Sequence, residues 1–317
     1  MDDKNLIVVV DQAFKHYKSF QLRRFFFRAF LIIIIVISFA LVSDDNKGKT
    51  TEGIPSINLG EHIAIININD MMGEGSLSRR SLTLLDQQAS GLKAIMLRVD
   101  SPGSGVTDAE AVYKQLLYYR SQGVPIVASF SSSATSGAYL VSSPADRIFS
   151  YRNSVVGSIG VIMEVPQVKP LLDKVGVGVV AVRSGSLKAA AQPFEPLNAE
   201  TKKELQRLVN RSASWFLNLV QTNRGLSNKT MKELSKGGVY NGDEALELGL
   251  VDSIGEWFDA LEWLHAEYPG LADVPVVNYD DYVYIPYQSS FNPLGELMWG
   301  IGSLSRMFSG LFRGGNL

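Results

Sequence analysis

The chain has 317 residues, of which 46% are hydrophobic, and a formal net charge of −2. It contains no cysteine, which excludes disulfides, thiol nucleophiles and cysteine-bound metals. No long basic run occurs, which argues against nucleic acid as a partner, and the apolar content is enough for one large folded domain or two small ones.

An apolar run at residues 25–43, FFFRAFLIIIIVISFALVS, is the first strong feature in chain order. At about 1.5 Å per residue, such a helix spans most of a hydrocarbon core about 30 Å thick. Asp44 and Asp45 follow the run, whereas the basic residues of this region precede Ala29: Lys4, Lys15, Lys18, Arg23, Arg24 and Arg28. This asymmetry predicts a single-pass transmembrane anchor, with residues 1–24 cytoplasmic and the remaining chain outside.

Two other interpretations of the apolar run stay open. A cleaved signal peptide needs small residues at its cleavage site, and FALVSDD is a poor match. A buried core helix is the second alternative, although four consecutive isoleucines beside a basic flank favour the bilayer.

A folded domain is predicted over residues 61–270, after a polar linker at residues 44–60 that is punctuated by glycine and proline. Compact apolar runs predict buried strands within the domain, at residues 62–70, 92–101 and 124–131. Helical patterns separate or follow them, and this alternation predicts an α/β fold with a largely parallel sheet.

Two of the helices predicted in the domain are long, and a further amphipathic pattern lies beyond it. The helix at residues 107–123 has Thr107 and Glu110 as a capping box and Gly123 as its stop. A long amphipathic helix follows at residues 198–225. The tail, residues 271–317, contains an amphipathic pattern at 293–313 that suits a membrane surface, a partner subunit or plain core packing.

Ser136 is the candidate nucleophile. It lies in ATSGAYL, between the strand predicted at residues 124–131 and the helical pattern GAYLVSSPA. A strand-to-helix turn exposes a side chain beside helix N–H groups, and small neighbours let a substrate backbone approach. An ordinary N-cap serine produces the same local pattern, so this stretch alone does not decide between the two.

A serine nucleophile needs a base, and the chain has three histidines. His16 precedes the predicted anchor, His62 begins a strand, and His265 lies in a helical pattern. Lys188 in RSGSLKAAAQPF is the other candidate, because a lysine in an apolar setting or near positive charge can become neutral and accept a proton. A surface lysine in a loop remains an alternative, and His62 and His265 stay open.

Five motifs together resemble the signal peptide peptidase A family of Ser-Lys peptidases. They are LRVDSPGSGV (97–106), SATSGAYLVSSPADRI (133–148), VVGSIGV (155–161), RSGSLKAAAQPF (183–194) and VYNGDEALELGLVD (239–252). The chain has one copy of this unit, as in the half-length, membrane-anchored members. The resemblance implies a Clp protease/crotonase-like α/β fold with a ββα superhelix core, and makes residues 61–270 a Ser-Lys peptidase domain.

The resemblance also implies roles for single residues. Ser136 is the implied nucleophile, Lys188 the implied general base, and Ser158 the serine that orients the lysine. The implied oxyanion hole uses backbone N–H groups of Gly137 and of the SPGS turn, at Gly103 and Ser104. Ser104 replaces a glycine that is usual in the family, which costs about 1 kcal/mol if this position needs a positive φ.

The implied function is a serine endopeptidase that degrades released signal peptides and other unfolded apolar peptides, with no cofactor and no metal. The implied assembly is a homo-octamer in which Ser136 and Lys188 come from neighbouring protomers. The other implied partners of the protein are the peptide substrates and the lipid bilayer, and its implied location is the inner membrane, with the catalytic domain on the periplasmic side. Two alternatives keep the fold: a catalytically silent scaffold or binding protein, and a crotonase-like acyl-CoA enzyme.

Overall fold

The computed structural model describes residues 58–69, 71–73 and 76–283. The predicted cytoplasmic segment, the predicted anchor and nearly all of the predicted linker lie outside these residues, as does the amphipathic pattern at 293–313. Over the described ranges, the helices are all too short or too polar to cross a membrane.

A single sheet of eight strands organises the described residues. The strands are β1 (His62–Ile68), β2 (Leu92–Ser101), β3 (Ile126–Thr135), β4 (Arg147–Ser150), β5 (Val155–Gly157), β6 (Val239–Tyr240), β7 (Ser253–Ile254) and β8 (Val276–Asn278). The main path runs β6-β5-β3-β2-β1-β8, while β4 pairs with both β3 and β7. All pairings are parallel except β5–β6, which confirms the predicted α/β class with a mostly parallel sheet.

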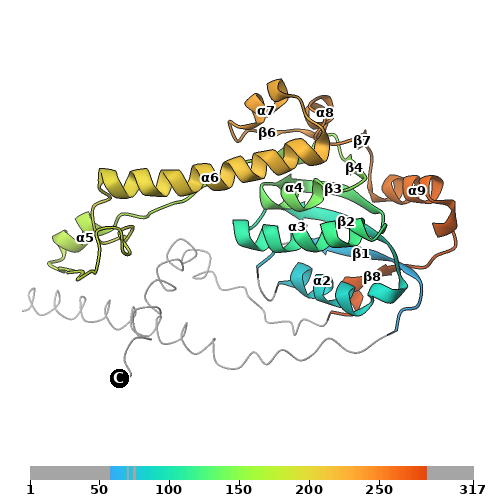
Figure 1. Cartoon of the computed structure of the whole chain (residues 1–317), viewed down its shortest axis with the longest axis horizontal. Helices are drawn as coiled ribbons and strands as arrows, with labels where there is room; N and C mark the ends of the chain where they lie inside the picture. The colour runs from blue at the N-terminus through green and yellow to red at the C-terminus, as the bar shows by residue number, and fades with distance from the viewer. Residues whose placement is uncertain (1–57, 70, 74–75, 284–317) are drawn as a thin grey trace, which may run out of the picture. The chain divides into compact units, whose positions relative to one another are not determined.

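Helices cover both faces of the central strands (Figure 1). They are α2 (Leu77–Gln87), α3 (Val106–Ser121), α4 (Gly137–Ser142), α5 (Lys169–Lys174), α6 (Ala199–Arg224), α7 (Asn228–Leu234), α8 (Gly242–Glu247) and α9 (Trp257–Glu267). Short 3-10 turns complete the described chain at Ala89–Gly91, Pro269–Leu271 and Tyr279–Asp281.

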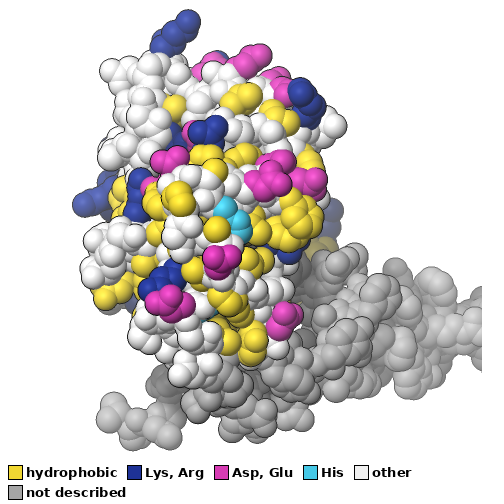
Figure 2. Space-filling model, turned by 90° about the vertical axis from the view of Figure 1, so that its right-hand side faces the viewer, with side chains coloured by type: hydrophobic (Ala, Val, Ile, Leu, Met, Phe, Trp, Pro, Cys, Tyr) yellow, Lys and Arg dark blue, Asp and Glu magenta, His cyan; other side chains and the backbone are white. Residues whose placement is uncertain are grey.

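The strand β2 shows why the sheet is buried on both sides. Ile95, Leu97 and Val99 face the core that contains residues of α2, α3 and α4, and all three are fully buried. Ala94 and Met96 point to the opposite face and pack in a second core with α9. A strand buried on both faces needs a continuous apolar run, which is what residues 92–101 supply. The α9 side of the molecule mixes hydrophobic, acidic and basic side chains (Figure 2).

The strand β3 is longer than predicted, and its two halves pair with different strands on the same side. Its first half pairs with β4, from Val127 opposite Arg147 onward, and its second half pairs with β5, ending at Thr135 opposite Gly157. The serine-rich residues 131–135 therefore belong to a strand, although their composition is typical of a loop. The ladder with β5 carries this strand up to the residue before Ser136.

Helix ends and the domain boundary differ in detail from the predictions. The helix α3 begins at Val106 with Gly105 at its N-cap and no side-chain cap, so the predicted Thr107 cap is wrong: Thr107 already lies inside the helix. Gly123, with φ of 82°, follows its end. The strand β8 pairs with β1 and extends the sheet beyond residue 270, where we expected the domain to end.

The long helix α6 is anchored to the core only near its C-terminal end. Asn223 donates hydrogen bonds to the hydroxyls of Tyr113 at 3.0 Å and Ser143 at 2.8 Å, and Phe216 and Val220 are buried. Its N-terminal half extends past the sheet to α5 (Figure 1). The segment between β5 and α6 therefore forms a separate lobe, which carries Lys188.

Candidate active site

Ser136 occupies the turn between β3 and α4 in a strained backbone conformation. Its φ is 53° and its ψ is −123°, a combination that residues with a side chain rarely adopt. Its N–H donates to the carbonyl oxygen of Gly157 at 2.8 Å, and its own carbonyl accepts from the N–H of Leu140 at 3.0 Å. These two bonds hold a sharp strand-to-helix turn, the arrangement that exposes a nucleophilic side chain at the end of a sheet.

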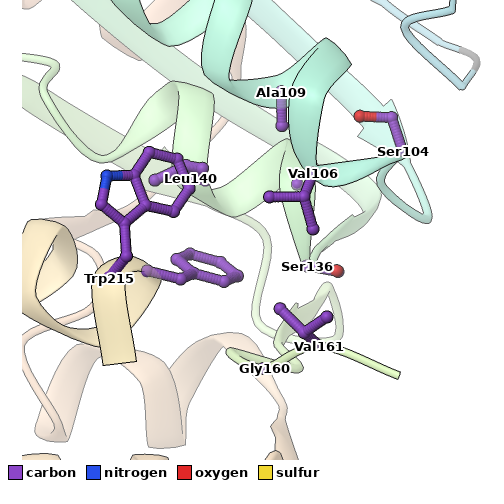
Figure 3. Close-up of a pocket in the computed structure, with 10 residues that line it drawn as sticks. Ser104, Val106, Ala109, Ser136, Leu140, Gly160, Val161 and Trp215 are labelled. Atoms are coloured by element: carbon purple, nitrogen blue, oxygen red, sulfur yellow. The ribbon is translucent and has the colours of Figure 1, made fainter. Parts of the chain in front are cut away.

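A small pocket opens beside Ser136 (Figure 3). Its walls come from α3, α4, α6 and the chain after β5, and are mostly apolar. The lining residues are Ser104, Val106, Ala109, Ser136, Gly137, Leu140, Gly160, Val161, Trp215 and Phe216. In Figure 3, Ser136 lies between Val106 and Val161, and Leu140 and Trp215 lie to one side of them.

The turn after β2 packs directly on the Ser136 turn. A Cβ placed on Gly103, whose φ is 108°, would lie 2.9 Å from the backbone nitrogen of Gly137 and 3.0 Å from the Cβ of Ser136. A Cβ placed on Gly137 would lie 3.0 Å from the backbone nitrogen of Ser104. The two segments approach this closely because both positions are glycine.

These contacts bring the three predicted oxyanion residues together, with one distinction among them. The N–H of Gly103 donates to the Oγ of Ser101 at 3.1 Å, so it is occupied within the turn. Ser104 and Gly137 are therefore the better candidates for oxyanion donors. Ser104 does not have a positive φ, so the serine at this position carries no left-handed backbone cost.

Ser158 lies next to Ser136 because the strands before them are paired. Thr135 is opposite Gly157 at the end of the β3–β5 ladder, and each serine comes one residue later. Ser158 also has a positive φ, 51°, and its N–H donates to the carbonyl oxygen of Gly238 at 2.7 Å. The side chain is half-buried.

Lys188 is not part of this cluster within one chain. It lies in an exposed turn of the lobe between β5 and α6, and it does not line the pocket. The lobe lies at the N-terminal end of α6, away from α4, at whose start Ser136 stands (Figure 1). The apolar setting that the sequence suggests for Lys188 is therefore absent in the single chain.

The histidines among the described residues, His62 and His265, are far from Ser136. The ring of His62 bonds the hydroxyl of Tyr279 at 2.6 Å and the carbonyl of Gly60 at 2.8 Å. His62 begins β1, whereas Ser136 follows the end of β3, and parallel strands place these at opposite edges of the sheet. His265 belongs to α9, on the other face.

Three residues at or near the pocket were not predicted from the sequence to be site residues. Trp215 and Phe216 lie on the apolar stripe of α6, where helical spacing predicts core packing and does not distinguish it from a pocket wall. Tyr240 packs against Gly157, on which a Cβ would lie 3.0 Å from the Tyr240 ring. Burial raises the pKa of Tyr240, and its buried hydroxyl has no hydrogen-bond partner among the described residues.

A second cavity lies on the sheet face that α9 partly covers. It is polar and is lined by Asn67, Asn69, Arg98, Asp100 and Ser131. None of the predicted site residues lines it. Elsewhere in the described chain, no group of three or more histidine, aspartate or glutamate side chains is placed to hold a metal ion.

Comparison with known proteins identifies the family. The profile of peptidase family S49 matches residues 119–269. A protein of Enterococcus faecium named "Putative signal peptide peptidase SppA" is 35% identical over 193 residues, covering 61% of this chain and 56% of that protein. A "Putative protease" of Synechocystis is 32% identical over 201 residues, covering 63% of this chain and 72% of that protein. The chain belongs to peptidase family S49.

The match spans little more than half the length of the Enterococcus protein. Among solved structures, a mutant of ClpP1 from Listeria monocytogenes is similar with a TM-score of 0.42 and 15% identity, covering 62% of this chain and 94% of that one.

Proposed function

We propose that the chain is a membrane-anchored serine endopeptidase with Ser136 as nucleophile and Lys188 of a second copy as general base. The observation that carries the proposal is the strained turn at Ser136, which holds a hydroxyl at the mouth of an apolar pocket beside two backbone N–H groups. Membership of a peptidase family supports the same chemistry.

The proposed reaction is acyl transfer. The Nζ of a neutral Lys188 takes the proton of Ser136 as its Oγ attacks the peptide carbonyl carbon. The N–H groups of Gly137 and Ser104 stabilise the oxyanion, for which one donor is worth about 3 kcal/mol. The C–N bond then breaks, the ammonium of Lys188 protonates the leaving amine, and water releases the acyl group from Ser136. Ser158, beside Ser136, orients the lysine.

Assembly is part of the proposal because one chain keeps its own Lys188 away from Ser136. The lobe that carries Lys188 has large apolar side chains in water: Val180 is 89% exposed and Val182 is 97% exposed. Exposed apolar segments of this kind suit burial against another protein surface. A closed ring of identical subunits, an octamer in our proposal, would cover each lobe with the next copy and complete each site.

The proposed substrates are released signal peptides and other unfolded apolar chains. The apolar walls of the pocket support this choice, as does the name of the Enterococcus relative. A single-pass anchor at residues 25–43, with the peptidase domain on the periplasmic side of the inner membrane, would hold the site where such peptides are released.

Single variants of the detergent-solubilised full chain test this function on casein and on a signal peptide. Ser136→Ala and Lys188→Ala are each expected to lower kcat by at least about 10³-fold. The first variant lacks the attacking hydroxyl, and the second lacks the group that accepts its proton. Ser132→Ala, in the same serine-rich strand, and Lys174→Ala, in the same lobe, are the matched controls and keep activity. Wild-type cleavage by either Ser136→Ala or Lys188→Ala would refute the assignment.

A further inference from the structure

An ion pair closes the base of the turn that presents Lys188. Arg183 and Glu195 lie 12 residues apart, and the Nη2 of Arg183 donates to the Oε1 of Glu195 at 2.5 Å. Their side chains are only 21% and 22% exposed. Lys188, near the middle of the enclosed segment, is exposed.

This ion pair differs from most others in the described chain. The pair of Arg207 and Glu204 on α6, for example, is 55% and 37% exposed and joins residues one helical turn apart. Water and salt weaken such exposed pairs, whereas shielding strengthens a pair that is well aligned. The pair of Arg183 and Glu195 is shielded and joins two points that the backbone alone does not hold together.

The enclosed segment has a defined shape of its own. The N–H of Lys188 donates to the carbonyl of Gly185 at 3.1 Å, and Ala189 has a positive φ of 52°. Nearer the base, the N–H of Val168 donates to the carbonyl of Pro193 at 2.7 Å, and Pro193 is buried. The turn is therefore fixed at its base and points Lys188 outward.

We infer that the Arg183–Glu195 ion pair is a positioning clamp that holds the Lys188 turn in the shape needed to reach Ser136 of a second copy. The inference rests on the proposed function. Ordering a flexible segment costs conformational entropy. Because the ion pair orders the segment in the single chain, this cost is not added when the subunits associate. Because catalysis depends on placement within about 1 Å, a looser turn lowers kcat even when the lysine is intact. Neither Arg183 nor Glu195 touches the substrate; both act through Lys188.

The test removes one charge with little change of shape. Glu195→Gln is expected to raise amide hydrogen exchange of residues 184–190 about tenfold and to lower kcat about tenfold, with KM nearly unchanged. The double variant Arg183→Glu with Glu195→Arg restores the opposite charges and is expected to recover both values. Glu204→Gln, which breaks the exposed pair on α6, is the matched control and changes neither.

The results separate this inference from the proposed function. If amide hydrogen exchange at residues 184–190 is unchanged in Glu195→Gln, the clamp is wrong, whatever the activity of Lys188→Ala. Faster exchange that the charge reversal does not slow again also overturns it. Full activity of Lys188→Ala overturns the proposed function, and with it the catalytic purpose of the clamp, even where exchange responds as expected.

Discussion

The backbone N–H of Ser136 donates to the carbonyl oxygen of Gly157 at 2.8 Å, and this bond joins the ends of β3 and β5 at the candidate nucleophile. It extends the parallel ladder by one step past Thr135 and holds Ser136 in its strained conformation. It also places Ser158, the next residue after Gly157, beside the nucleophile. The site is thus built by strand pairing between segments that are separated by a helix and a further strand.

Gly103→Ala is expected to lower kcat by more than about tenfold. The added methyl would lie 2.9 Å from the backbone nitrogen of Gly137 and the carbonyl oxygen of Thr135, so the oxyanion turn has to move. Gly123→Ala is the control: Gly123 also has a positive φ, 82°, but open space for a Cβ. It should lose about 1 kcal/mol of stability and keep its activity. Equal kcat values of Gly103→Ala and Gly123→Ala would show that the close approach of the Gly103 turn to the Ser136 turn is unimportant for catalysis.

Trp215→Ala is expected to change substrate preference. The pocket has a cavity volume of about 20 Å³, enough for a small group only, and Trp215 forms part of its apolar wall. Removing the indole should raise kcat/KM for a leucine relative to an alanine beside the scissile bond by about tenfold. A series of fluorogenic peptides that differ at this residue measures the ratio. Leu208→Ala, an exposed position of α6, should leave the ratio unchanged, and no shift in Trp215→Ala would exclude this pocket as the specificity site.

Arg224→Gln is expected to destabilise the domain by about 3 kcal/mol, because it leaves a partly buried carboxylate without its charged partner. The Nη2 of Arg224 donates to Asp252 at 2.5 Å, and the Arg224 side chain is 7% exposed. Arg207→Gln breaks the exposed pair with Glu204 and should cost less than about 1 kcal/mol. Urea unfolding of the two variants gives the comparison. Similar losses would show that burial of the Arg224 pair has no energetic consequence.

The buried Tyr139 predicts a loss of stability in alkali. Burial raises its pKa above the ordinary value of 10.0, and its hydroxyl donates to the carbonyl of Leu250 at 2.9 Å. The folded state therefore holds this proton more tightly than the unfolded state. The stabilisation is complete below about pH 10 and declines as the pH rises above that value toward the folded pKa.

Tyr139→Phe should cost about 1 kcal/mol near neutral pH, through the lost hydrogen bond, and lose less stability than wild type between about pH 8 and 10.5. Urea midpoints at the two pH values measure this difference. Tyr118→Phe, at an exposed position, should follow wild type. Equal alkaline losses in Tyr139→Phe and wild type would contradict the role of Tyr139.

Much of the fold follows from local pattern. The apolar run at residues 92–101 predicts β2 to the residue, because burial on both faces leaves a continuous signal. The ends of α6 are also local: Asn198 caps its first turn and Gly225 ends it in a left-handed conformation. The turn at Ser136 follows from the same kind of evidence, an apolar strand followed by small residues and a helical pattern.

Other features depend on contacts that no local pattern contains. The serine-rich residues 131–135 lie in a strand because residues 133–135 pair with β5, and the Ser133 N–H also donates to Asp100. Spacing in the sequence likewise does not tell whether Lys188 meets Ser136 within one chain. The direction of α6 and its lobe decides that question, and it depends on how α6 docks on α3 and α4.

The most direct measurement mixes two inactive variants of the full chain, Ser136→Ala and Lys188→Ala, and lets them assemble together. If each site takes Ser136 from one copy and Lys188 from the next, about a quarter of the sites in a random one-to-one mixture contain both residues, and about a quarter of wild-type activity returns. If the activity of the mixture stays at the level of the separate variants, Ser136 and Lys188 do not meet between copies, and the proposed active site is wrong.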